Sequence, residues 1–110
     1  MTNWHSDLVQ VNGHAIHYYR TGGQKSPLIL LHGFSDNGLC WLRAAQTLQV
    51  TYDLIMPDAH GHGLSYRVTP GQPLNLVDDV AGLIQALELK KPALLGHSMG
   101  ASTAERCSWL

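Results

Sequence analysis

The first twenty residues carry two β-prone runs that a turn signal separates. The runs cover residues 7–11 and 14–20, and Asn12-Gly13 stands between them. Asparagine and glycine tolerate the left-handed backbone conformations of a two-residue hairpin loop at little steric cost. The pattern therefore predicts a β-hairpin at the start of the chain.

Three later runs are short and largely apolar, with Asp53 as the one charged residue among them. They cover residues 27–31, 52–56 and 92–95. Short runs of this kind are typical of strands in a sheet that helices cover on both faces. We expect each of them to be a strand of one sheet.

Between these runs, apolar residues recur at helical spacing. Residues 39–50 carry one apolar stripe, and a second helix is expected to begin at Asn75, which can act as its N-cap. The second stripe consists of Leu76, Val80, Leu83, Ile84 and Leu87. Strands that alternate with helices indicate a mostly parallel, helix-covered sheet. The expected fold class is α/β, and no linker or repeat divides residues 1–110.

The last apolar run leads into Gly96-His97-Ser98-Met99-Gly100, a G-x-S-x-G pattern between a predicted strand and a predicted helix. This context is typical of a nucleophile elbow, in which the serine stands on a strained turn at the end of a strand. Glycine is then required at both ends, because a Cβ there would collide with the backbone of so sharp a turn. The alternative is an ordinary strand-to-helix loop whose serine caps the helix.

Two further segments each follow a predicted strand: L-L-H-G-F at residues 30–34 and P-D-A-H-G-H-G-L-S at residues 57–65. Together with L-L-G-H-S-M-G at residues 94–100, they resemble the N-terminal half of the α/β-hydrolase superfamily. The likeness runs from about His14 to Thr103 and is strongest to single-domain esterases, lactonases and C–C hydrolases. The chain is therefore expected to be a partial α/β-hydrolase domain over residues 1–110.

The resemblance implies serine chemistry on an ester-like small molecule. Ser98 Oγ would attack a carbonyl carbon, and the backbone N–H groups of Phe34 and Met99 would stabilise the oxyanion. Phe34, Trp41 and Met99 suggest an apolar acyl pocket, although all three fit the core equally well. Dehalogenases and epoxide hydrolases of this fold use aspartate where this chain has Ser98, which makes their chemistry the weaker expectation.

The rest of a catalytic triad is not found after the elbow. In this fold the serine is followed along the chain by an acid and then by a histidine. After Ser98 the only acidic residue is Glu105, and no histidine follows. His32 is interpreted as a turn-fixing hydrogen-bonding residue rather than as the base. The hypothesis is a truncated or frame-shifted hydrolase, or one piece of a two-part protein, that is weakly active or inactive alone.

A second hypothesis is a non-enzymatic, hydrolase-like module. If the sheet stops after the elbow strand, residues 92–95 form an exposed apolar edge that can pair with a partner or with a second copy. Such a module would bind or dimerise through this edge rather than catalyse a reaction.

Composition excludes several other classes of function. Seven basic residues stand against eight acidic ones without a basic cluster, which argues against a nucleic-acid partner. No apolar run approaches the ~20 residues that cross a bilayer, and no secretory leader is recognised. Two cysteines allow at most one disulfide, so a reduced, cytoplasmic protein is expected. Asp58, His60 and His62 have the alternation of metal ligands, but glycines among them favour a loop, and no metal or cofactor is expected.

Overall fold

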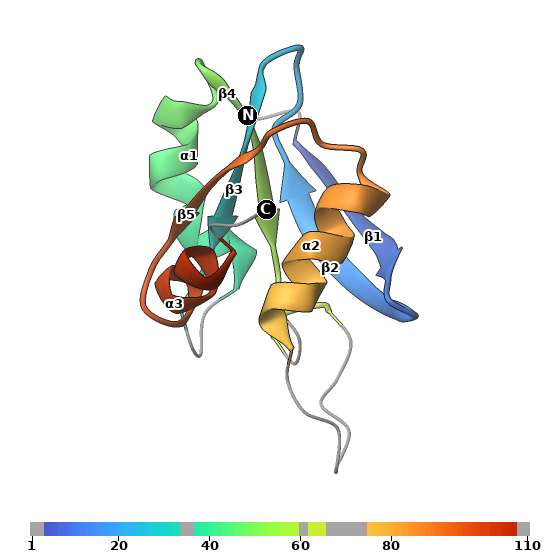
Figure 1. The fold of residues 1–110 in the computed structure, drawn as a ribbon. Coiled ribbons are helices and arrows are strands. Elements are labelled where there is room, and N and C mark those ends of the chain that lie inside the picture. The colour runs from blue at the N-terminus through green and yellow to red at the C-terminus, as the bar shows by residue number, and fades with distance from the viewer. Residues whose placement is uncertain (1–3, 34–36, 60–61, 66–74, 108–110) are drawn as a thin grey trace.

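One mixed five-stranded sheet organises the chain, with the strand order β1-β2-β4-β3-β5 (Figure 1). The structure is a computed structural model that describes residues 4–33, 37–59, 62–65 and 75–107. The strands are β1 (His5–Val11), β2 (His14–Arg20), β3 (Ser26–Leu31), β4 (Tyr52–Pro57) and β5 (Ala93–Gly96). β4, β3 and β5 run parallel to one another, whereas β1 and β2 form an antiparallel hairpin that joins β4 antiparallel. The predicted α/β class is confirmed.

Helices cover both faces of this sheet. They are the 3-10 helix η1 (Gly38–Trp41) and the α-helices α1 (Leu42–Leu48), α2 (Leu76–Ala86) and α3 (Met99–Arg106). In β3, Ile29 and Leu31 belong to a core cluster with α2, while Leu28 and Leu30 belong to a cluster with α1. Successive strand residues point to opposite faces. The two clusters therefore lie on opposite sides of the sheet, with α2 on one side and α1 on the other (Figure 1).

Local sequence signals account for several boundaries. Asn12 and Gly13 both have positive φ, 53° and 84°, as the predicted hairpin turn requires. The side chain of Asn75 accepts a hydrogen bond from the N–H of Asp78, so the predicted N-cap of α2 is confirmed. The predicted helix at 39–50 is shorter, because its first turn is η1. There Gly38 approaches the backbone of Met56 so closely that a Cβ would overlap the Met56 carbonyl.

The antiparallel hairpin is fastened to the parallel strands by a partly buried ion pair. Arg20 on β2 donates from Nη2 to Asp53 Oδ2 on β4 at 2.6 Å, and from Nε to both carboxylate oxygens. The N–H of Gly22 also donates to Asp53, at 3.0 Å. These hydrogen bonds to Asp53 raise the pKa of the Arg20 guanidinium above its ordinary value.

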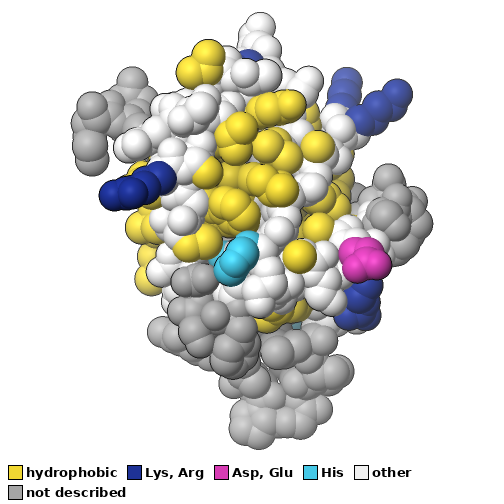
Figure 2. All heavy atoms as spheres, turned by 90° about the vertical axis from the view of Figure 1, so that its left-hand side faces the viewer, with side chains coloured by type: hydrophobic (Ala, Val, Ile, Leu, Met, Phe, Trp, Pro, Cys, Tyr) yellow, Lys and Arg dark blue, Asp and Glu magenta, His cyan; other side chains and the backbone are white. Residues whose placement is uncertain are grey.

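β5 forms one edge of the sheet, where the hypothesis of an exposed edge places it. Leu95 in this strand is 44% exposed. Figure 2 views the molecule from the side on which β5 and α1 lie in Figure 1, and hydrophobic side chains cover much of that surface. Among the described residues, no helix is long and apolar enough to cross a membrane.

Candidate active site

Ser98 occupies a sharp turn between β5 and α3. Its backbone has φ 57° and ψ −114°, a combination that costs a non-glycine residue about 1–3 kcal/mol. Ser98 is exposed, and although it is the N-cap residue of α3, its side chain makes no capping hydrogen bond. The alternative of an ordinary helix-capping serine is therefore wrong. A strained, exposed serine at a strand-to-helix turn is the geometry of a nucleophile elbow.

Contacts between backbones hold this turn in place. A Cβ on Gly96 would overlap the carbonyl oxygen of Gly100, and a Cβ on Gly100 would overlap that of Leu31 at the end of β3. The N–H of His97 donates to the same Leu31 oxygen at 3.0 Å. No side chain fits at either glycine position, so the prediction that both glycines are required sterically is confirmed.

The loop after β3 lies directly against the elbow. A Cβ on Gly33 would stand 3.2 Å from Ser98 Cβ and 3.2 Å from His97 Nδ1. Because β3 and β5 are parallel, the loops that follow them meet at one end of the sheet, where α/β folds build their sites. Phe34, the next residue and a predicted oxyanion donor, lies outside the described residues.

Met99 is the first residue of α3. Its N–H belongs to the first turn of the helix, where backbone donors have no partner within the helix and carry a partial positive charge. Met99 also lines a cavity of about 40 Å³, together with residues of α2 and α3 and of the loops after β3 and β4, among them His32, Asp58, Val80 and Thr103. That cavity is far smaller than the roughly 300–1,000 Å³ of a typical ligand pocket.

His32 fixes the turn that leads away from β3. The ring is buried, with Nδ1 2.7 Å from the carbonyl oxygen of Gly33, and the N–H of Ala59 donates to Nε2 at 2.9 Å. Both ring nitrogens are thus engaged in backbone hydrogen bonds, with Nδ1–H as the donor. The interpretation of His32 as a turn-fixing residue is confirmed, and it ties the loop after β3 to the loop after β4.

Trp41, the predicted pocket residue, ends η1 and packs against the cluster that contains Leu30, Leu54 and Met56. Its indole N–H is buried and finds no hydrogen-bond partner among the described residues. This position suits a core residue, and its contact with a substrate remains a prediction.

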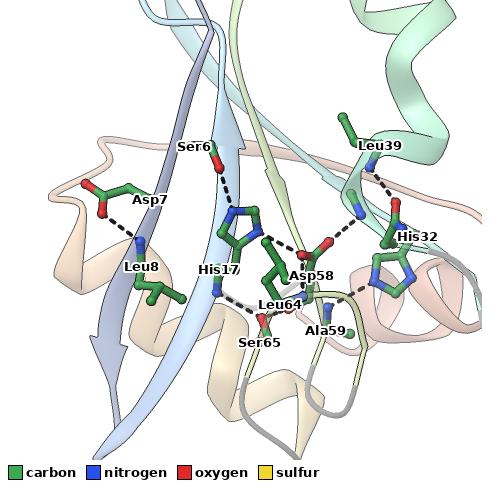
Figure 3. A network of polar contacts seen from close by, with 12 residues as sticks. Ser6, Asp7, Leu8, His17, His32, Leu39, Asp58, Ala59, Leu64 and Ser65 are labelled. Atoms are coloured by element: carbon green, nitrogen blue, oxygen red, sulfur yellow. Dashed lines mark hydrogen bonds and ion pairs between the residues drawn. The ribbon is translucent and has the colours of Figure 1, made fainter.

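Asp58 and His17 form a buried polar network that the motif analysis missed (Figure 3). The Asp58 carboxylate, 1% exposed, accepts from His17 Nδ1 at 2.8 Å and from the N–H groups of Gly38 at 2.6 Å and Leu64 at 3.0 Å. Ser65 accepts from the His17 N–H and donates to the Asp58 carbonyl oxygen. The signal in the sequence was the segment 57–65, which begins with Pro57-Asp58 and ends with Ser65. In the structure, Asp58 and Ser65 are joined by a hydrogen bond.

The alternative of a metal site does not gain support from this arrangement. The Asp58 carboxylate is occupied by backbone and histidine donors, and His60 lies outside the described residues. Within the ranges that the structure describes, no three or more His, Cys, Asp or Glu side chains gather in a way that could hold a metal ion.

Comparison with known proteins defines the class of protein that this fold and turn represent. Residues 28–109, which make up most of the chain, match the model of the Alpha/beta hydrolase family. The chain belongs to that family.

Individual relatives agree with this assignment. The chain is 33% identical over 95 residues to a soluble epoxide hydrolase of Corynebacterium, covering 86% of this chain and 33% of the relative. It is 35% identical over 105 residues to N-formylmaleamate deformylase of Pseudomonas putida, covering 91% and 38%. A crystal structure of an N-formylmaleamic acid deformylase from Pseudomonas putida superimposes with a TM-score of 0.84 at 29% identity, covering 94% of this chain and 41% of that one. The chain thus spans 33–41% of the length of these relatives.

Proposed function

We propose that Ser98 is the nucleophile of a serine hydrolase that acts on an ester or a similar carbonyl compound. The observation that carries this proposal is the backbone of Ser98, whose positive φ presents an uncapped hydroxyl at the start of α3. A non-glycine residue is kept in such a conformation only where the surrounding structure enforces it, and strain of this kind clusters at functional sites.

In the proposed reaction, Ser98 Oγ bonds to the substrate carbonyl carbon, and the carbonyl oxygen takes the negative charge of the tetrahedral intermediate. The N–H groups of Met99 and Phe34 donate to that oxyanion, and the positive end of α3 adds to the stabilisation. Removal of one such donor typically lowers kcat about 10²–10³-fold. A deformylase acts on a formyl group, so the Pseudomonas putida relative supports carbonyl chemistry at this fold.

Full turnover needs a histidine that takes the Ser98 proton and an acid that orients that histidine. We assign neither role to a residue of this chain, because His32 is engaged by backbone groups and Glu105 stands alone after the elbow. The base and acid are proposed to come from residues that complete the hydrolase domain, as the greater length of the relatives suggests.

The test is labelling of the chain with a fluorophosphonate, followed by digestion and mass spectrometry of each serine peptide. We expect phosphonate on Ser98 and none at that position in Ser98→Ala. Ser102→Ala is the matched control, because Ser102 is exposed one helical turn further along α3. Labelling is expected to be slow, because no base for Ser98 is assigned in this chain. Labelling of Ser102 in place of Ser98, or a Ser98 peptide that stays unmodified after prolonged exposure, would overturn the proposal.

A second candidate function is self-association through β5, and the exposure of Leu95 in this edge strand favours it. Two copies that pair along β5 would bury this leucine and the apolar surface around it. Leu95→Lys should then reduce the dimer fraction in analytical ultracentrifugation. Leu8→Lys is the control, because Leu8 is 55% exposed on the opposite edge strand. A monomeric chain, or equal loss of dimer in both variants, would contradict pairing through β5.

A further inference from the structure

A serine other than Ser98 stands in a Ser-His-Asp arrangement. It lies on β1, at the opposite edge of the sheet from β5. Ser6 Oγ on β1 lies 2.7 Å from His17 Nε2, and His17 Nδ1 lies 2.8 Å from Asp58 Oδ2 (Figure 3). The serine and the carboxylate thus contact opposite nitrogens of one imidazole. This is the set of contacts by which a histidine removes the proton of a serine while a carboxylate holds the ring.

The sheet brings these residues together although they are far apart in the sequence. In the hairpin, Leu8 pairs with His17 and Ser6 pairs with Tyr19, so Ser6 and His17 are diagonal neighbours on one face. The N–H of Asp58, just after β4, donates to the His17 carbonyl oxygen at 2.8 Å. The two side-chain contacts therefore span 11 and 41 positions of the sequence.

Burial and exposure are divided within this cluster as an activated nucleophile requires. His17 is 3% exposed and Asp58 1%, and backbone N–H groups of Gly38 and Leu64 hold the carboxylate in place. Ser6, in contrast, is exposed, and β1 is an edge strand. The base is thus oriented and shielded, while the serine residue that it contacts is exposed on the edge strand.

The geometry points to a second reactive site, in which Ser6 is a nucleophile activated by His17 and Asp58 toward esters and phosphonates with good leaving groups. In the reaction with a fluorophosphonate, Ser6 Oγ bonds to phosphorus, the phosphorus–fluorine bond breaks and fluoride leaves. The Ser6 proton passes to His17 Nε2, while Nδ1–H remains hydrogen-bonded to Asp58 Oδ2. The site is independent of Ser98.

The expected size of the effect follows from general base catalysis. A positioned base typically accelerates a proton-transfer-limited step by about 10²–10⁴-fold. We assign no oxyanion donors to Ser6, so reaction is expected with activated electrophiles and not with ordinary esters or amides.

The decisive measurement compares two serines of the unaltered chain. Ser26, the first residue of β3, is exposed like Ser6 but stands outside the His17 network. After a timed exposure to a fluorophosphonate, peptide mapping should give a Ser6 rate about 100-fold or more above that of Ser26. Equal rates at the two serines would overturn the inference. Reaction at Ser98 is read on a separate peptide, so the outcome does not depend on that site.

Variants then test whether the network is the cause. His17→Gln and Asp58→Asn should each lower the Ser6 rate to that of Ser26, while Ser26→Ala leaves it unchanged. Circular dichroism establishes that each variant is folded, and if one is not, the comparison of Ser6 with Ser26 in the unaltered chain decides alone. Rapid Ser6 labelling that persists in both folded variants would show that His17 is not the base.

Discussion

The loops that follow β4 and β5 meet the same end of the sheet but are held there by different means. The elbow after β5 is fixed by glycines whose backbones touch Gly100 and Leu31, with hardly any side chain involved. The loop after β4 is fixed by the Asp58 carboxylate and its hydrogen-bond donors. A glycine in close backbone contact has no room for an added Cβ. A buried carboxylate, when it is removed, leaves its hydrogen-bond donors without an acceptor. The loop after β4 also holds one glycine that has no room for a Cβ, because a Cβ on Gly63 would overlap the Asp58 carboxylate. The two loops should therefore differ most in their response to the loss of a side chain.

The largest effect is expected from removal of the Asp58 carboxylate. Asp58→Ala leaves the His17 Nδ1–H and the N–H of Gly38 buried without their acceptor, and it also removes the acceptor of the Leu64 N–H. Such a loss should lower the free energy of unfolding by about 3–5 kcal/mol in urea denaturation. Asp7→Ala is the control, because Asp7 is exposed on β1. A loss under about 1 kcal/mol would mean that water replaces the missing acceptor.

A somewhat smaller effect is expected from one added methyl group in the elbow. In Gly100→Ala the Cβ meets the Leu31 carbonyl, which belongs to β3 and cannot move aside, so we expect a loss of about 3 kcal/mol.

The control for this substitution is Gly82→Ala in α2, where the Cβ meets the side chain of Val11 instead of backbone. Val11 is buried and must shift, which for overpacking costs about 1–3 kcal/mol, but alanine favours the helix by up to about 1 kcal/mol. This variant should therefore lose less stability than Gly100→Ala. Equal losses in both variants would show that crowding against backbone is not what distinguishes the elbow.

The smallest perturbation uses the two cysteines as reporters. Cys107, just after α3, is 2% exposed, and burial raises the pKa of its thiol above the ordinary value, whereas Cys40 is exposed. Less thiolate and less access should make Cys107 alkylation by iodoacetamide at least about tenfold slower than that of Cys40 at pH 8.

The raised pKa also sets the sign of a small pH dependence. The neutral Cys107 thiol favours the folded state, so its contribution to stability is complete below the unfolded pKa of 9.0 and is lost as the pH rises above it.

Gly100→Ala should speed Cys107 alkylation more than Asp7→Ala does, because it disturbs the turn that positions α3. If Gly100→Ala is destabilised but its Cys107 is alkylated no faster, the elbow does not control the position of α3.

Sequence reasoning succeeded where the physical cause is local. Asn12-Gly13 sets its own backbone angles, Asn75 caps the helix that it precedes, and Gly96 with Gly100 marks the elbow within five residues. The hairpin turn and the helix cap depend on residues that are neighbours in the chain. The elbow has a local motif as well, although Gly100 is also confined by Leu31 of β3.

Sequence reasoning fell short where the cause is a contact between distant strands. His17 was only one residue of an alternating strand until the register of β2 and β4 placed it against Asp58. The helix predicted at 39–50 was not expected to begin as a 3-10 helix. The cause is again a distant contact, because the N–H of Gly38 donates to Asp58, 20 positions further along. Such pairings follow from the order of strands, which the hydrophobic pattern does not encode.

The backbone at Ser98 also limits which residues can replace this serine. A β-branched side chain is disfavoured at a φ of 57°, which makes threonine a poor replacement although it carries the same hydroxyl. Unbranched polar residues such as aspartate, asparagine and cysteine fit that conformation without rebuilding the turn. The elbow thus restricts the shape of the side chain more strictly than its reactivity. If Ser98 is the nucleophile, as we propose, a change of this one codon gives the scaffold a different nucleophile while the glycines around it stay the same.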